Sequence, residues 1–312
     1  MNTMVSAWSS ARNRSTLLLL ALAVLGTACR TAAPPPPAPV AMVEVPPKIG
    51  LALGGGGARG FAHIGVLRVL EQEKIPIDIV IGTSVGSLIG ALYADSGRVL
   101  DAEFLATEVD EEDFFDFGAM PIFSGGLARG EALEAFLTTH LRHATFEAMP
   151  VRFGAVASEL RSGRTVVFEQ GSVAQGVRAS SAIPGVFVPV AIGGELYVDG
   201  GVTDPVPADA ARARGAELVI AVAIPAAVRE RAPTSAVGIV LQSISILSAR
   251  LQELRAREAD VVLVPEVGDV AYDDFTQKKR LIEAGEAAAR AALPELRAAI
   301  RARTRLVPAP TR

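Results

Sequence analysis

The chain has 312 residues, of which 50% are hydrophobic and 21% are charged, and its formal net charge is −4. This composition is typical of a globular protein, and the length is enough for one large α/β domain or two small ones. The acidic balance and the aromatic content of 5% argue against nucleic-acid binding, which uses basic patches and stacking aromatic side chains. There are three histidines and one cysteine, none at zinc spacing, so the sequence predicts neither a metal nor a cofactor.

Residues 1–29 have the pattern of an export signal. Two arginines precede an apolar run at 17–25, and small residues follow up to Cys29. A basic start, a short apolar run and a small-residue site describe a secretory signal, and the run is shorter than the roughly 20 apolar residues of a bilayer span. Cys29, the only cysteine, resembles the lipidated cysteine of a bacterial lipobox; ordinary cleavage after Ala28 or Ala33 is the alternative. We therefore expect an exported protein: a membrane-anchored lipoprotein facing the periplasm, or otherwise a periplasmic or secreted protein.

A proline-rich segment follows at 30–47 and holds seven of the twenty prolines. Such a segment has no means of packing a core and favours extended polyproline II. It is interpreted either as a tether between a membrane and a folded domain or as a plain disordered leader.

Strand-like and helix-like segments alternate from Lys48 onward, which indicates a single α/β domain over about 48–305. Apolar runs predict strands at 48–53, 77–82, 151–160, 165–171, 216–224 and 259–265, and apolar stripes predict helices at 60–74, 84–97, 129–142, 237–257 and 277–303. The first two strand–helix units favour parallel pairing with right-handed crossovers. We predict a three-layer α/β/α sandwich with a mainly parallel central sheet.

The glycine-rich segment 53–60 joins the first strand to the first helix. Its glycines let backbone N–H groups converge on one point in front of a helix N-terminus, which makes an anion site. Gly55, Gly57 and Gly60 also fit G-x-G-x-x-G, the dinucleotide-binding fingerprint. That fingerprint requires an acidic residue at the end of the second strand, whereas Asp78 stands at its beginning. A nucleotide-binding oxidoreductase is therefore kept as an alternative function.

A second motif, Gly82-Thr83-Ser84-Val85-Gly86, directly follows the second strand and begins the next helix. In a G-x-S-x-G nucleophile elbow, serine occupies a sharp strand-to-helix turn, and glycines relieve crowding around it. The helix dipole favours negative charge that develops there. Ser84 is therefore the candidate nucleophile, and the alternative is an ordinary helix-capping serine.

A nucleophilic serine needs a neighbouring proton acceptor. In an α/β-hydrolase the base is a late histidine, but no histidine follows His143, although much of the predicted sheet does. His63 is interpreted as a packing or hydrogen-bonding residue, and His140 and His143 as solvated. A carboxylate is the better candidate, and Asp199 in Asp199-Gly200-Gly201 is the one we select over its reading as a simple turn residue.

In this order, GGGGARG (54–60), GTSVG (82–86) and DGG (199–201) resemble the patatin-like phospholipase family, as do ASSAIPGVF (179–187) and DGGVTDPVP (199–207). The resemblance covers Lys48 to about Val270. It implies a Ser–Asp dyad on a three-layer α/β/α fold and hydrolysis of fatty-acyl esters of phospholipids or other lipids, without a metal. The implied partners are a lipid ester substrate and a membrane surface.

The resemblance also assigns roles to single residues. It implies that Ser84 is the nucleophile, Asp199 the base, and the amides of Gly55, Gly56, Gly57 and Ala58 the oxyanion hole. Arg59 is expected to brace the loop or add positive potential, and Gly82, Gly86 and Gly200 to support the turns. The segment Phe114–Leu127 is interpreted as a lid or membrane-contact loop, or else as a loop packed over the core. A non-catalytic lipid-binding lipoprotein remains a further alternative.

Overall fold

The computed structural model describes residues 41–109, 126, 128–225 and 234–309. The predicted signal, most of the proline-rich segment and nearly all of Phe114–Leu127 lie outside the described residues, so these predictions stay predictions. By compactness the chain divides into two units, the larger one being Glu44–Val307 and the smaller one including residues 41–43 with Pro308 and Ala309. Strands β1 (Met42–Val45) and β10 (Arg305–Pro308) pair with each other as a small separate sheet.

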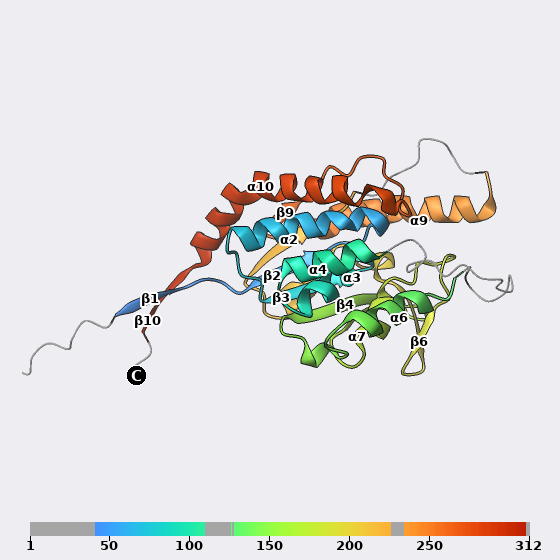
Figure 1. The fold of residues 1–312 in the computed structure, drawn as a ribbon, viewed down its shortest axis with the longest axis horizontal. Helices are drawn as coiled ribbons and strands as arrows, with labels where there is room; N and C mark the ends of the chain where they lie inside the picture. The colour runs from blue at the N-terminus through green and yellow to red at the C-terminus, as the bar shows by residue number, and fades with distance from the viewer. Residues whose placement is uncertain (1–40, 110–125, 127, 226–233, 310–312) are drawn as a thin grey trace, which may run out of the picture. The chain divides into compact units, whose positions relative to one another are not determined.

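The larger unit is built on an eight-stranded sheet (Figure 1). Its order is β6-β7-β4-β3-β2-β8-β9, and β5 pairs with β4. Strands β4, β3, β2, β8 and β9 are parallel, whereas β5 and β7 run antiparallel to β4, and β6 runs antiparallel to β7. The strands are β2 (Ile49–Leu53), β3 (Ile79–Thr83), β4 (Arg152–Glu159), β5 (Thr165–Phe168), β6 (Val190–Ile192), β7 (Glu195–Asp199), β8 (Leu218–Val222) and β9 (Val261–Leu263).

Helices cover both faces of this sheet, so the predicted three-layer α/β/α fold with a mainly parallel sheet is confirmed. One core contains residues of α2 (Ala62–Gln72), α3 (Val85–Ala94), α4 (Val99–Glu108), α6 (Glu131–His140), α7 (Val173–Ser180) and α10 (Lys278–Arg303). The other contains residues of α8 (Ala208–Ala213) and the end of α9 (Ala236–Ala256). Short 3-10 turns are η1 (Gly57–Phe61), η2 (Phe146–Ala148), η3 (Gly200–Val202) and η4 (Phe275–Gln277).

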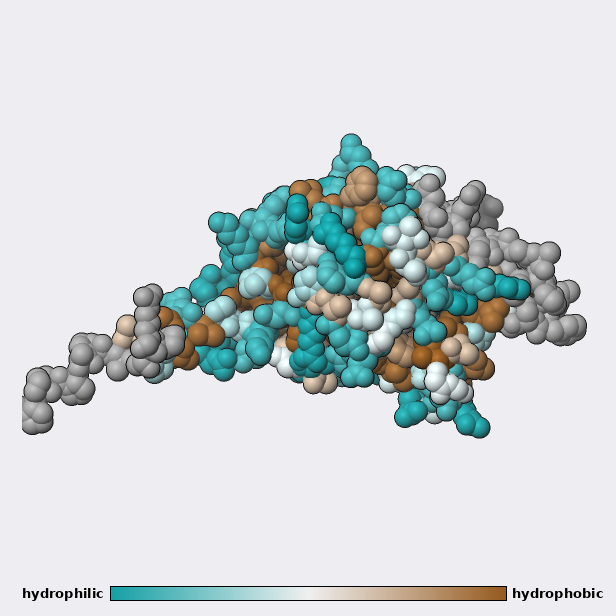
Figure 2. Space-filling view, turned by 60° about the horizontal axis from the view of Figure 1, so that its bottom comes forward, coloured by the Kyte–Doolittle hydropathy of each residue, from teal (hydrophilic) through white to brown (hydrophobic). Residues whose placement is uncertain are grey.

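The two cores differ in the size of their side chains. Along β2 and β8, alternate residues face opposite sides because side chains in a strand alternate. Leu51, Leu53 and Ile220 face the larger core, whereas Ala52 and Ala221 face the smaller, alanine-rich one. Small residues on this side allow α8 to approach the sheet closely. On the surface shown in Figure 2, hydrophilic residues predominate and hydrophobic residues lie in small groups between them.

Helices α2 and α10 lie side by side, although they are far apart in the sequence (Figure 1, blue and red). Glycines make this approach possible: a Cβ added at Gly65 would lie 1.9 Å from Ile282 O, and one added at Gly285 would lie 1.9 Å from Ala62 O. The C-terminal helix is thereby fixed against the helix that follows the glycine-rich loop.

The predicted strands and long helices are present, with β4 and β5 joined as the expected antiparallel pair. The sequence analysis missed α7, α8 and the antiparallel β6–β7 hairpin, which extends the sheet beyond β4. This hairpin matters for function because β7 ends at Asp199.

Candidate active site

Ser84 occupies the turn between β3 and α3, as the elbow motif predicts. Its backbone is in an unusual region, with φ 54° and ψ −127°, and Ser84 is one of two non-glycine residues with positive φ in the described part of the chain. Such a conformation costs roughly 1–3 kcal/mol and persists only where the surroundings impose it. The side chain is held at the C-terminal end of β3, in front of the helix.

The two elbow glycines are required by close backbone contacts. A Cβ at Gly82 would lie 2.3 Å from Gly86 O, and a Cβ at Gly86 would lie 2.2 Å from Leu53 O. A side chain at Gly82 would force β3 and α3 apart, and one at Gly86 would force α3 away from the end of β2. The same argument holds for Gly200, where a Cβ would lie 2.2 Å from Val156 O. Gly82, Gly86 and Gly200 therefore allow the backbone geometry on which the site depends.

Asp199 comes close to Ser84 because β4 extends beyond the end of β3. Thr83, at the end of β3, pairs with Val156, and β4 continues beyond this point to Glu159. Strand β7 pairs with the overhanging part and runs back, so that its last residue, Asp199, pairs with Ala157. The C-terminal residue of the antiparallel strand β7 therefore lies near the C-terminal end of the parallel strand β3. The Ser84 hydroxyl lies within reach of the Asp199 carboxylate and lowers its pKa.

Asp199 is buried, with only 6% of its surface exposed. Burial raises the pKa of the carboxyl group to about 6, although hydrogen bonds from the Ser84 hydroxyl and the Gly201 amide lower it. The Gly201 N–H donates to Asp199 Oδ1 over 2.7 Å, and the Asp199 N–H donates to Ala182 O over 2.8 Å. The carboxylate is therefore fixed in position and has a pKa suited to accepting a proton near neutral pH.

The glycine-rich loop approaches Ser84 closely: a Cβ at Gly55 would lie 3.3 Å from Ser84 Cβ. Two of its four predicted oxyanion donors are already engaged, however. The Gly55 N–H donates to Pro205 O (3.0 Å), and the Ala58 N–H donates to Tyr272 O (2.7 Å). The prediction is therefore corrected for Gly55 and Ala58, whose amides hold the loop in place. Gly56 and Gly57 keep half-exposed backbones.

Arg59 stabilises this loop through two hydrogen bonds to backbone carbonyls. Its Nε donates to Gly56 O over 3.0 Å, and its Nη1 donates to Pro225 O over 2.6 Å. Burial lowers the pKa of Arg59 to about 10, so the guanidinium stays charged at neutral pH. The carbonyl of Gly56 is turned towards the arginine.

The histidines are not positioned as the base. His63 is fully buried, and its Nε2 lies 2.8 Å from Gly54 O. Burial lowers the pKa of His63 to about 4, against the effect of this hydrogen bond, so the ring is neutral and donates to the carbonyl. His140 is exposed and stacks on Phe136, and His143 is half-buried against Asp95. The predicted packing role of His63 is confirmed, and His143 is less solvated than expected.

Sequence analysis missed Ser180, at the end of α7. Its side chain is fully buried, and its Oγ accepts the Ser84 N–H over 2.9 Å. The hydroxyl thus holds the strained backbone of the candidate nucleophile from the neighbouring helix. Ser180 lies in the ASSAIPGVF segment that the sequence analysis singled out, but the motif alone does not reveal the contact between Ser180 and Ser84.

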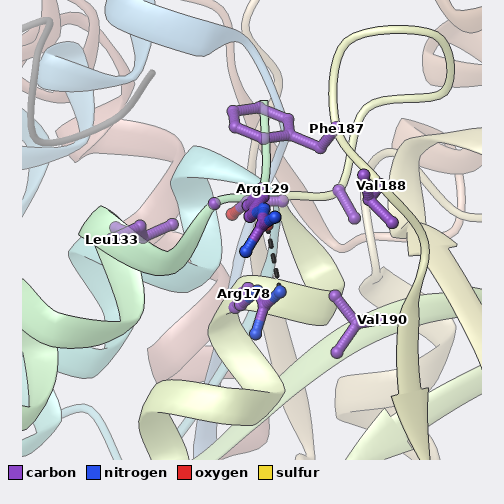
Figure 3. A pocket seen from close by; sticks show the side chains of 9 residues that line it. Arg129, Leu133, Arg178, Phe187, Val188 and Val190 are labelled. Atoms are coloured by element: carbon purple, nitrogen blue, oxygen red, sulfur yellow. Dashed lines mark hydrogen bonds between the residues drawn. The ribbon is translucent and has the colours of Figure 1, made fainter. Parts of the chain in front are cut away.

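A small pocket lies beside the same segment (Figure 3). In Figure 3, Arg178 extends towards Arg129, and its Nη2 donates to Arg129 O over 3.0 Å. The other guanidinium nitrogen, Nη1, pairs with Glu134 at 2.6 Å. The lining is otherwise mostly apolar: Gly130, Leu133, Ser181, Ala182, Phe187, Val188 and Val190. Because Ala182 O also receives the Asp199 N–H, this pocket adjoins the strand end that carries Asp199.

The position of Asp78 bears on the dinucleotide alternative. Its Oδ2 accepts the Ile49 N–H over 2.7 Å at the beginning of β2 and β3, whereas the glycine-rich loop follows the other end of β2. The carboxylate therefore lies at the wrong end of the sheet to bind the ribose of a nucleotide held by the loop. Within the described residues, no group of three or more histidine, cysteine or acidic side chains is arranged to hold a metal ion.

The chain is similar to several known proteins. The model of the patatin-like phospholipase family matches residues 51–212. The chain is 34% identical over 178 residues to the NTE family protein Mb1092c of Mycobacterium bovis, a match that covers 57% of this chain and 49% of that protein. It is also 33% identical over 230 residues to the mouse patatin-like phospholipase domain-containing protein 6, covering 71% of this chain and 16% of that protein.

The chain therefore spans about half, or less, of the length of these relatives. Among solved structures, VipD from Legionella pneumophila has a similar fold, with a TM-score of 0.56 at 16% sequence identity, covering 87% of this chain and 70% of that one. The family model covers half of the chain and includes the glycine-rich loop, the elbow and Asp199. The chain belongs to the patatin-like phospholipase family.

Proposed function

We propose that this protein is a lipid acyl hydrolase that cleaves fatty-acyl esters of phospholipids or other lipids through a dyad of Ser84 and Asp199. The observation that carries the proposal is the proximity of the Ser84 hydroxyl to a buried carboxylate whose pKa is about 6, in a chain of the patatin-like phospholipase family. A serine at a strained elbow, a base within hydrogen-bond reach and a loop of backbone amides are the parts that acyl transfer needs.

In the proposed reaction, Ser84 Oγ attacks the ester carbonyl while Asp199 takes the hydroxyl proton. The carbonyl oxygen becomes negative and is stabilised by the Gly56 and Gly57 amides, which have no competing acceptor within the described residues. The carbon–oxygen bond to the alcohol then breaks, and the proton passes from Asp199 to the leaving oxygen. Water, deprotonated by the same carboxylate, cleaves the acyl-enzyme and restores Ser84. These steps need no metal.

The first prediction concerns the nucleophile. Ser84→Ala should lower the hydrolysis of p-nitrophenyl acyl esters by about 10⁴-fold or more, since loss of a serine nucleophile has effects of this size in other serine enzymes. Asp199→Asn should be similarly inactive, because an amide of nearly the same shape does not accept the proton. The hydrolysis rates of both variants are measured together with their thermal unfolding, which should show that each variant is folded.

Ser96→Ala, a change of a half-buried serine that follows α3, is the matched control and should keep the parent rate. A fluorophosphonate probe should label the parent and the Ser96 variant but not the Ser84 variant. Near-normal hydrolysis by Ser84→Ala would reject the dyad. If the folded parent bound lipid but hydrolysed no ester, the non-catalytic lipid-binding alternative would replace it.

We also propose that the protein is exported and held at a membrane, facing the periplasm, through lipid modification of Cys29. The support is the sequence pattern of residues 1–29 and the uniqueness of this cysteine. No helix in the described part of the chain is long and apolar enough to cross a bilayer. Without lipidation, the same signal would give a periplasmic or secreted protein.

A further inference from the structure

Helix α9 exposes several of its apolar residues. Five large hydrophobic side chains on this helix are 44–69% exposed: Ile239, Val240, Ile246, Leu247 and Leu254. Near its C-terminal end, the side chains that are buried are Gln252 and Ala256, each 7% exposed. A surface helix of a globular protein normally shows the opposite arrangement, with apolar residues inside and polar residues outside.

The exposed residues share one side of the helix. Val240, Leu247 and Leu254 recur every seven residues, and Ile239 and Ile246 lie beside them, so all five form one stripe. From Ala236 to Ala249 the sequence has no charged residue, a length of about 21 Å in a helix. An apolar stripe that lies mostly on an uncharged segment of this length indicates a surface that another molecule or a lipid phase covers.

A second copy of the chain is the poorer occupant for this stripe. Paired helices need apolar residues at both seam positions of the heptad. Here Val240, Leu247 and Leu254 would take one seam position. In one register the other position falls on Ser243 and Arg250, both exposed, and in the other register it falls on Ile244 and Leu251, which the domain already covers in part. A seam on the exposed face would therefore bring two arginines together. At a lipid surface, by contrast, a long arginine side chain can extend to the headgroups while its neighbours stay in the apolar layer.

The helix that carries the stripe also contacts the segment of the candidate active site. Arg255, in the last turn of α9, lies 3.8 Å from Asp204 and 3.7 Å from Asp209. The backbone of Asp204 in turn accepts the Thr83 hydroxyl over 2.8 Å, directly before Ser84. Val202, on η3 after Asp199, is 46% exposed, and η3 contacts α9. The end of α9 is thus attached to the segment that carries the base.

We propose that α9 is an interfacial helix that lays this stripe on the lipid surface holding the ester substrate. The proposal rests on the proposed function, because a hydrolase acting on lipids meets its substrate in an aggregated phase rather than as single molecules. An apolar helix face bound in the plane of the interface would bring the Ser84 turn next to the headgroup layer. Arg250, which is exposed and pairs with Glu253, would lie at the level of anionic headgroups.

The direct test places a label on the stripe of the full chain. In a Cys29→Ala background the chain has no cysteine, so Leu247→Cys provides one site for an environment-sensitive fluorophore. Vesicles of phosphatidylethanolamine and phosphatidylglycerol should shift its emission to the blue. The matched control is Leu100→Cys on α4, where the leucine is 65% exposed, close to the 69% of Leu247; its emission should stay unchanged. Equal shifts at both positions, or none at Leu247→Cys, would overturn the proposal.

A second arm measures turnover. Replacing Val240, Leu247 and Leu254 with serine should lower hydrolysis of vesicle phospholipid by at least about tenfold, the effect of losing roughly 1.4 kcal/mol of binding. Hydrolysis of a soluble short-chain ester should be unchanged, which also shows that the variant folds. The control replaces Leu100 and Phe104, each 65% exposed on α4, with serine and should keep both activities. Equal losses in the two variants would contradict a specific role for α9.

The outcomes separate this proposal from the dyad. Adding Ser84→Ala to the Leu247→Cys chain should abolish hydrolysis and leave the blue shift intact. If the shift persists but no ester is cleaved even with Ser84 present, the proposed function fails and the lipid contact stands. If the label instead responds to protein concentration without vesicles, a second copy covers the stripe and the lipid assignment is wrong.

Discussion

Ser180 is the residue on which the geometry of Ser84 depends most directly. Its Oγ is the acceptor for the Ser84 N–H, inside a fully buried environment. Without the hydroxyl, a buried N–H would lose its partner, which costs roughly 1–3 kcal/mol. The strained turn would then be free to relax away from Asp199. In the proposed mechanism Ser180 is a positioning residue, because it acts through the Ser84 backbone.

We predict that Ser180→Ala lowers kcat by about ten- to a hundredfold, the range expected when a reacting group is displaced by less than 1 Å or so. KM for a short soluble ester should stay nearly constant, since the binding surface is retained. The matched control is Ser181→Ala, which removes the next hydroxyl, also buried but without a hydrogen-bond partner among the residues that the structure describes. Steady-state kinetics on both variants decide the matter: equal effects, or a change in KM alone, would show a merely structural role.

The pKa of Asp199 predicts a pH dependence. Burial raises this pKa from 3.8 to about 6, and a base must be ionised to accept a proton. The parent kcat/KM should therefore rise as pH increases through about 6 and level off above it, because this parameter reports the free enzyme. A profile that is flat between pH 5 and 8, measured with a soluble ester, would argue against Asp199 as the base.

The same shift predicts an effect on stability. A raised pKa means that the folded state binds the proton more tightly than the unfolded state, so this group's contribution to stability falls as pH rises from about 4 to 6. At pH 8 the ionised, buried carboxylate destabilises the fold. We therefore compare the unfolding temperature of Asp199→Asn with that of the parent at each pH. The difference should favour the variant more at pH 8 than at pH 4. This gain would accompany complete loss of activity.

At the scale of elements, the contact between α2 and α10 depends on two glycines. Gly65→Ala would place a methyl group 1.9 Å from Ile282 O, so the two helices would have to separate. We predict a loss of about 1–3 kcal/mol in unfolding free energy. Gly285→Ala, at the same interface, should lower the unfolding free energy by a similar amount. The double variant should lose less unfolding free energy than the two single variants together, because the first substitution has already moved the helices apart.

The control for this pair is Ala287→Ser, on the exposed side of α10, which should leave the free energy nearly unchanged. Chemical denaturation of the four proteins and the parent gives all the values needed. Additive costs would mean that the helices adjust separately and that the contact is not shared.

The same elements show what the sequence could predict. Strands β2 and β3, the elbow and α3 are local features, because apolar runs, glycines and helix periodicity are written in adjacent residues. Asp199 was selected from its motif, but its meeting with Ser84 depends on how far β4 extends past β3, which no local pattern encodes. The Ala58 amide donates to Tyr272, more than 200 residues away, so its engagement follows from the tertiary fold and not from any local pattern.

At the scale of the whole molecule, two proposed membrane contacts have different roles. A lipid on Cys29, followed by the proline-rich segment 30–47, would keep the domain near the surface without orienting it. The stripe on α9 would orient the domain so that the Ser84 turn faces the lipid. A tether raises the effective concentration of the second contact and so partly compensates for a weak one.

This coupling gives the last prediction. Removing Cys29 by substitution with alanine should release the protein from the membrane fraction of the expressing cells, whereas serine substitution of Val240, Leu247 and Leu254 should not. The α9 substitutions should lower the turnover of membrane phospholipid less when Cys29 is present than in the Cys29→Ala background. The reason is that the tether supplies the proximity that the stripe no longer provides. Fractionation and phospholipid turnover of the four combinations measure this. Equal losses in both backgrounds would mean that the two contacts act independently, and retention of the Cys29→Ala protein at the membrane would mean that the cysteine does not anchor it.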